Sequence, residues 1–139
     1  MYVIYKKIFL IILLISASLI TFSQEILDIQ LVSISNIYNN HVGNEWSHDV
    51  TVNQKTLTRY KNLNFKKSEI NTLIFKVNCI EFDEKYPDFG SNTKTIDLSK
   101  IDFSNEYLFS IEVTVIENGG RYKSNKAKWK YSFKINSKK

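Results

Sequence analysis

The sequence predicts an all-β domain, namely an antiparallel β-sandwich of about seven to eight strands. First, apolar and polar residues alternate with a period of two over most of the chain, whereas the period of about 3.6 that marks an amphipathic helix is nearly absent. Second, short polar connections separate the alternating segments. Third, the 139 residues include one proline and four glycines and show no internal repeat. Short strands joined in this way are typical of a sandwich.

The first four expected strands lie at 26–38, 46–52, 55–60 and 71–82. The polar segment 39–44 predicts a loop after the first strand. In the second strand Trp46, His48 and Val50 share one face, and the polar pair at 53–54 predicts the turn that follows. The fourth strand is more continuously apolar than the others, so we expect it to lie in the centre of a sheet.

Three further strands are expected in the second half, at 93–98, 107–115 and 126–136. The strand at 107–115 shows the cleanest alternation in the chain. Asn118, Gly119 and Gly120 follow it and give a strong turn signal, so we expect the last two strands to form a hairpin. The single helical candidate is a turn at 65–70.

A secretory signal peptide is predicted over residues 1–23. Two lysines precede an apolar run at 8–15, and small and hydroxylated residues follow this run, which is the order of a signal peptide. The apolar stretch is shorter than the about 20 residues that span a bilayer, which favours cleavage over retention as a membrane anchor. We expect cleavage after Ser23, with cleavage after Ser18 as the alternative and an uncleaved anchor as the less favoured outcome.

The remaining segment, 24–139, is expected to form one domain that is secreted or periplasmic and has no transmembrane helix after cleavage. It contains the only cysteine of the chain, Cys79, which therefore has no partner for an internal disulfide. Because Cys79 lies in phase with Phe75 and Val77, we expect a thiol that faces the core.

The charge distribution predicts an acidic body with a basic end. The full chain carries a net charge of +5, and from Arg121 onward it has eight basic residues and no acidic residue. Four of these basic residues alternate with apolar residues in the last expected strand, namely Lys126, Lys128, Lys130 and Lys134. This alternation indicates a solvated strand face, so no specific nucleic-acid binding is expected.

Motifs of common enzyme families are absent from the sequence. It has no Gly-rich phosphate loop, no His-Glu-x-x-His motif and no Gly-x-Ser-x-Gly motif. His41 and His48 fit no common zinc spacing, and His48 is expected to be half-buried and hydrogen-bonded because it lies in phase with Trp46. We therefore expect a protein that is not an enzyme. A small hydrolase with Asp83 and Asp88 as its acid pair is the third hypothesis.

An acidic segment follows the apolar strand at 71–82. Its four carboxylates are those of Glu81, Asp83, Glu84 and Asp88. Acids clustered at the mouth of a strand suit a hard cation, and calcium accepts six to eight oxygen ligands in a flexible geometry. The alternative interpretation is a soluble acidic turn that contains Pro87 and Gly90.

The order of several features resembles that of C2 domains, which are calcium-dependent membrane-binding β-sandwiches. The features are Gly43-Asn44-Glu45-Trp46, the alternation Val50-x-Val52, the strand Leu73 to Val77, and then Glu81-x-Asp83 and Asp88-Phe89. The resemblance implies that Glu81, Asp83 and Asp88 are calcium ligands and that Glu45 stands at a further acidic position. Glutamates replace aspartates at two of these positions, which implies weak binding of one ion. An immunoglobulin-like sandwich is the alternative fold.

The sequence leaves two classes of function open. The first is an exported, non-catalytic β-sandwich that binds calcium through Glu81, Asp83, Asp88 and Glu45, and thereby engages a protein, glycan or membrane surface. The second is a calcium-independent interaction or inhibitor domain of the cell envelope or the extracellular space, which would use a sheet edge or the hairpin at 107–136.

Overall fold

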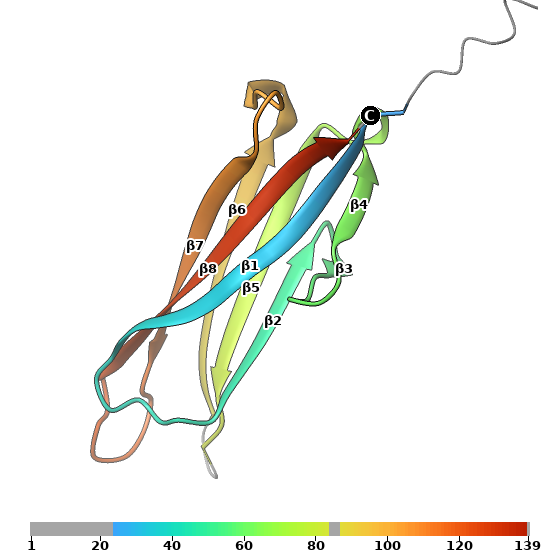
Figure 1. Ribbon diagram of the computed structural model, residues 1–139. Coiled ribbons are helices and arrows are strands. Elements are labelled where there is room, and N and C mark those ends of the chain that lie inside the picture. Colours follow the sequence, from blue (N-terminus) through green and yellow to red (C-terminus); the bar gives the residue numbers. More distant parts are fainter. Residues whose placement is uncertain (1–23, 84–86, 139) are drawn as a thin grey trace, which may run out of the picture.

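The computed structural model describes residues 24–83 and 87–138, so the predicted signal peptide at 1–23 lies outside the described residues. The predicted antiparallel β-sandwich is confirmed, because two four-stranded antiparallel sheets pack against each other (Figure 1). No helix in the described part of the chain is long and apolar enough to cross a membrane.

Each sheet combines strands from distant parts of the sequence. The first sheet has the order β4-β1-β8-β7 and contains β1 (Ile26–Asn39), β4 (Leu63–Lys66), β7 (Tyr107–Ile116) and β8 (Lys126–Lys138). The second sheet has the order β3-β2-β5-β6 and contains β2 (Trp46–Val52), β3 (Lys55–Thr56), β5 (Thr72–Glu81) and β6 (Asp88–Asp97). β5 is an interior strand of its sheet, as its continuous apolar run predicts.

The pairing of β1 with β8 defines the two ends of the sandwich. Ile26 pairs with Lys138 at one end, and Asn39 pairs with Ala127 at the other, with two irregularities between them. The two ends of the described chain therefore meet at the first end. The β1–β2, β5–β6 and β7–β8 connections all lie at the second end, which is the lower end in Figure 1. Residues from all three connections can therefore contribute to one site.

The core lies between the two sheets and follows the predicted alternation. Phe75 of β5 packs against Phe109 of β7 and Phe133 of β8, with ring centroids 4.9 and 5.1 Å apart. Cys79 is fully buried, as predicted. On β8 the inward residues are buried, whereas Lys126, Lys128 and Lys130 are exposed and Lys134 is half-buried beside Glu106.

The predictions for residues 55–70 are partly wrong. The strand expected at 55–60 is the two-residue β3, and the helical turn expected at 65–70 is the end of β4 followed by a short 3-10 helix, Lys67–Glu69. Phe65 is buried and pairs with Leu27 of β1, so a tertiary contact determines its extended backbone. A strand of four residues is too short to show a period of its own.

β6 is much longer than the strand expected at 93–98. It begins at Asp88 and forms a hairpin with β5 in which Glu81 pairs with Asp88. The alternative interpretation of the acidic segment assigns Gly90 to a turn, whereas in the structure Gly90 lies inside β6, where the opposite sheet comes close. A Cβ atom at Gly90 would lie 2.9 Å from the Val113 side chain and closer still to the Thr114 carbonyl oxygen. Glycine is needed here because β6 and β7 leave no space for a side chain.

A buried carboxylate joins β1 to the end of β8. Asp28 is 2% exposed and accepts hydrogen bonds from Lys138 at 2.7 Å, from Asn62 at 2.9 Å and from Gln30 at 3.2 Å. Burial alone would raise the pKa of Asp28, but the hydrogen bonds from these three side chains outweigh it and hold the pKa below its usual value of 3.8.

This pKa shift predicts a stability difference that depends on pH. A carboxylate with a lowered pKa stabilises the fold above its unfolded-state pKa, and the contribution is lost as the pH falls through the folded-state pKa. Asp28→Asn should therefore lower the free energy of unfolding by about 1–3 kcal/mol at neutral pH. In urea titrations the difference from the parent should shrink as the pH falls below 3.8. Asp49→Asn, at an exposed position of β2, is the control. A constant difference at every pH would contradict this account.

Candidate cation site

Three strand ends bring acidic side chains together at the lower end of the sandwich. On β5 the residues Phe75, Val77 and Cys79 face the core, and Glu81 continues the same face at the last position of the strand. Asp88 is its partner at the first position of β6. Local alternation and the hairpin register thus direct both carboxylates inward.

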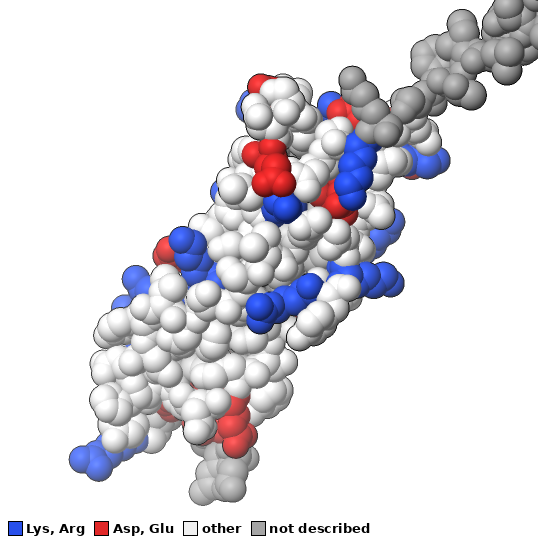
Figure 2. Space-filling model, viewed as in Figure 1, with Lys and Arg blue, Asp and Glu red and all other residues white. Residues whose placement is uncertain are grey.

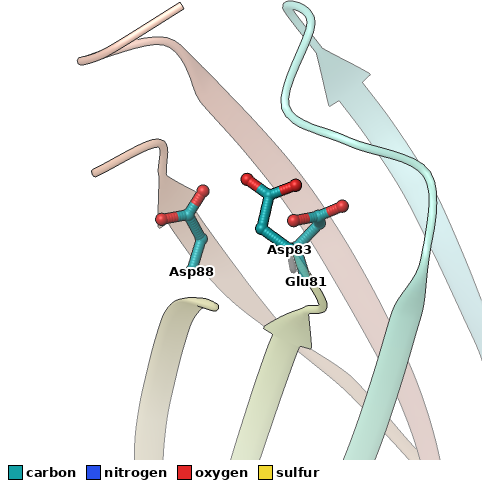
Figure 3. A group of neighbouring side chains, drawn as sticks. All are labelled: Glu81, Asp83 and Asp88. Atoms are coloured by element: carbon teal, nitrogen blue, oxygen red, sulfur yellow. The ribbon is translucent and has the colours of Figure 1, made fainter. Parts of the chain in front are cut away.

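Glu81, Asp83 and Asp88 place one carboxylate oxygen each within 4.8 Å of one another. Figure 3 shows their carboxylates pointing into the same space, Asp88 from the start of β6, Glu81 from the end of β5 and Asp83 from the connection that follows β5. Calcium–oxygen distances of 2.3–2.6 Å allow ligands of one ion to be up to about 5 Å apart. The three oxygens are therefore close enough together to be candidate ligands of one calcium ion.

Two of these carboxylates are buried and only partly hydrogen-bonded. Glu81 is 2% exposed and Asp88 is 0% exposed. Glu81 accepts hydrogen bonds from the backbone N–H groups of Glu45 and Asn44, and Oδ1 of Asp88 accepts one from the N–H of Asn118 at 2.8 Å. Oε2 of Glu81 and Oδ2 of Asp88 accept no hydrogen bond from the described residues, although the Asp88 carboxylate lies within hydrogen-bonding range of the Glu117 carboxyl group. Buried polar atoms are almost always satisfied, so this pair of oxygens requires an explanation.

Glu117 is a fourth buried acid at this end, and the sequence analysis did not select it. It follows the last residue of β7 and is 8% exposed. Burial raises its pKa, and the neighbouring Asp88 carboxylate, within hydrogen-bonding range, raises it further. The signal for Glu117 in the sequence is an acid at the end of a well-formed strand, directly before the turn at 118–120.

The negative charge of the four neighbouring acids favours the binding of a cation. Burial raises the pKa of Glu81, and the nearby Asp83 carboxylate adds to the increase. Among residues 24–83 and 87–138, the ion pairs involve other acids and none of these four. All candidate ligand atoms are carboxylate oxygens, which select hard cations such as calcium over zinc or copper.

Glu45 differs from the other predicted ligands. Its side chain is exposed and does not belong to the group of three oxygens. Its main chain supports the site instead, because its N–H donates to Glu81 and its carbonyl accepts a hydrogen bond from Phe82 at 2.8 Å. The structure thus gathers three of the four residues that the sequence selected.

The two histidines lie outside the group of acids. His48 is half-buried, as predicted, and its Nδ1 lies 2.7 Å from the hydroxyl of Tyr131. Burial lowers the pKa of His48. His41 is exposed in the β1–β2 connection and stacks on Tyr122.

Comparison with known proteins assigns no activity to this group of residues. No protein-family model matches the sequence, and no curated protein matches it. The resemblance to C2 domains therefore stays a prediction from short motifs. The observations that support a cation site are the close approach of the Glu81, Asp83 and Asp88 carboxylates and the unpartnered oxygens of two of them.

The β1–β2 connection closes the buried side of the site through Gly43. Gly43 has a φ of +27°, and a Cβ atom there would overlap the carboxylate of Glu81. The absence of a side chain at this position therefore allows Glu81 to occupy its inward position. Gly120 has a φ of +66°, but a Cβ atom there would meet no described atom within 4 Å.

These two glycines provide a matched pair of variants. Gly120→Ala should cost about 1–2 kcal/mol of unfolding free energy, because it carries only the strain of a positive φ. Gly43→Ala should cost about 2–4 kcal/mol, because it adds the displacement of Glu81 to the same strain. Chemical denaturation measures both changes. Equal losses for the two variants would show that Gly43 and Glu81 are not packed as described.

Proposed function

We propose that this protein is an exported, non-catalytic β-sandwich that binds one calcium ion through Glu81, Asp83 and Asp88 and thereby engages a surface or partner. The observation that carries the proposal is the pair of buried oxygens without partners, Oε2 of Glu81 and Oδ2 of Asp88. A cation between them would satisfy both atoms and offset the repulsion of three close carboxylates.

Calcium fits the shape and position of the group better than other common metals. The ligands come from two strand ends and one connection, which gives the irregular, flexible set of oxygens that calcium accepts. Magnesium requires a near-ideal octahedron and retains several waters. Asp83 is exposed, so an ion could enter from solvent without opening the sandwich.

The location of the site agrees with the resemblance to C2 domains. In C2 domains and in this protein, acidic residues lie at one end of a sandwich, at or just beyond the ends of strands. This end is also the one farthest from the two ends of the described chain, which meet at Ile26 and Lys138. An attachment at either terminus would leave the acidic end free to meet a partner.

A calcium-independent interaction domain is the second candidate, and one observation favours it. Phe82 and Phe89 are 52% and 54% exposed. Phe89 pairs with Ile80, so these two side chains form a small apolar patch on the outer face of the second sheet, and the exposed Phe82 follows directly after β5. Exposed apolar patches mark interaction surfaces.

Calcium should stabilise the protein if the proposal is correct. At a free calcium concentration 100 times the dissociation constant, binding to the folded state alone adds about 2.7 kcal/mol to the free energy of unfolding. For a domain of this size that corresponds to a rise of about 5–15 °C in the melting temperature. Differential scanning calorimetry with calcium, magnesium or a chelator measures the rise and its selectivity.

Single amide substitutions identify the ligands. Asp83→Asn and Asp88→Asn should each remove most of the calcium-dependent rise, because each takes away a charged ligand. Glu45→Gln should keep the rise, because its side chain lies outside the group of three oxygens. If calcium leaves the melting temperature of the parent protein unchanged, the proposal fails and the apolar patch becomes the main candidate.

A further inference from the structure

An open pocket lies directly beside the proposed calcium site. It has a volume of about 490 Å³, within the range of about 300–1,000 Å³ that is typical of small-ligand sites. Residues of the β1–β2 connection form one wall, and residues of the β7–β8 connection form the other. In Figure 2 acidic atoms are visible at this lower end of the molecule.

The pocket and the group of acids share residues. Asp83 and Glu117 line the pocket, whereas Glu81 and Asp88 are buried behind it. An ion held by the three carboxylates would therefore be enclosed on its inner side and open toward the pocket. Calcium takes six to eight oxygens, so some of its coordination positions would face the pocket and accept oxygens from water or from a ligand.

His41 of the β1–β2 connection and Tyr122 of the β7–β8 connection together form an aromatic wall of the pocket. His41 and Tyr122 stack with ring centroids 5.1 Å apart and planes at 16°, and the Arg121 guanidinium lies 5.8 Å from the Tyr122 ring centre. Tyr122 is 43% exposed, although it belongs to a stacked pair. The aromatic wall offers an apolar surface for a ring-shaped ligand. Asn44 also lines the pocket, and its side-chain amide can donate and accept hydrogen bonds.

Charge restricts the class of ligand. Three carboxylates exceed the two positive charges of one calcium ion, and Glu117 adds a further acid to the wall. An anionic ligand would meet an excess of negative charge, whereas Arg121 opposes a cationic one. A neutral ligand rich in hydroxyl oxygens has no such penalty.

We propose that the pocket binds a neutral sugar residue, with two vicinal hydroxyls that complete the coordination of calcium and a ring that packs against His41 and Tyr122. This inference rests on the proposed calcium site and adds the chemical class of the ligand. Vicinal hydroxyls supply two hard oxygens at a fixed spacing, and the C–H face of a pyranose suits an aromatic wall.

Amide NMR spectra test the proposal with defined probes. Methyl α-mannoside and methyl β-galactoside are added separately to the protein in about 5 mM calcium, above the dissociation constants of about 0.1–1 mM typical of extracellular calcium modules. At least one sugar should shift the signals of Gly119, Gly120 and Tyr122 in a saturable way, and a chelator should abolish the shifts. Cyclohexylmethanol, which has a six-membered ring but no vicinal hydroxyls, should cause no such shift.

A pair of tyrosine variants separates the aromatic wall from the ion. Tyr122→Ala should weaken sugar binding about 3–10-fold while the calcium-dependent rise in melting temperature persists. Tyr60→Ala is the matched control, because Tyr60 is 97% exposed and lies outside the pocket. Equal sugar affinity in both variants would show that the sugar ring does not pack against Tyr122.

Other outcomes distinguish this inference from the calcium proposal. A calcium-dependent rise in melting temperature without any sugar response would overturn the sugar site and leave the calcium site standing. Sugar shifts that persist in chelator would overturn coordination by the ion. Calcium-dependent capture on phosphatidylserine vesicles, with no response to either sugar, would assign this end of the molecule to a membrane surface and overturn the proposal.

Discussion

Burial of the Glu81 and Asp88 carboxylates is the constraint on which the lower end of the sandwich depends. The two residues form the last pair of the β5–β6 hairpin, and both point between the sheets. Three backbone N–H groups donate hydrogen bonds to them. Those of Asn44 and Glu45 bind Glu81, and that of Asn118 binds Asp88. Burying charged groups costs several kcal/mol each unless they are paired. These hydrogen bonds leave one oxygen of each carboxylate unsatisfied, and the proposed cation would bind between these two oxygens.

The sequence predicted the sandwich because its long strands carry their own signal. Alternation along β7 and β8 reports which face is buried, and a period of two cannot be confused with a helix over ten residues. β4 escaped prediction because Phe65 is extended only through its pairing with β1. The start of β6 was not predicted as a strand because Pro87 and Gly90 are typical turn residues, whereas Gly90 is required by the close approach of β7.

The candidate site was predictable where its residues are close in sequence. Glu81, Asp83 and Asp88 belong to one hairpin, so the acidic segment revealed them together. Glu117 comes from the other sheet and reaches the group only through the packing of β6 against β7. Gly43 makes room for Glu81 because it has no side chain, and Glu45 supports Glu81 through a backbone N–H group that its side chain does not influence. Only the tertiary structure shows that Glu45 contributes its backbone to the site.

The central claim is that one calcium ion lies between Glu81, Asp83 and Asp88. A crystal structure of the protein grown with calcium tests it most directly, because anomalous scattering identifies the ion independently of the protein model. The account predicts one peak with carboxylate oxygens of all three residues at about 2.3–2.6 Å from it. A map without this peak, in which the carboxylates of Glu81 and Asp88 instead share a proton or bind a lysine, would contradict it.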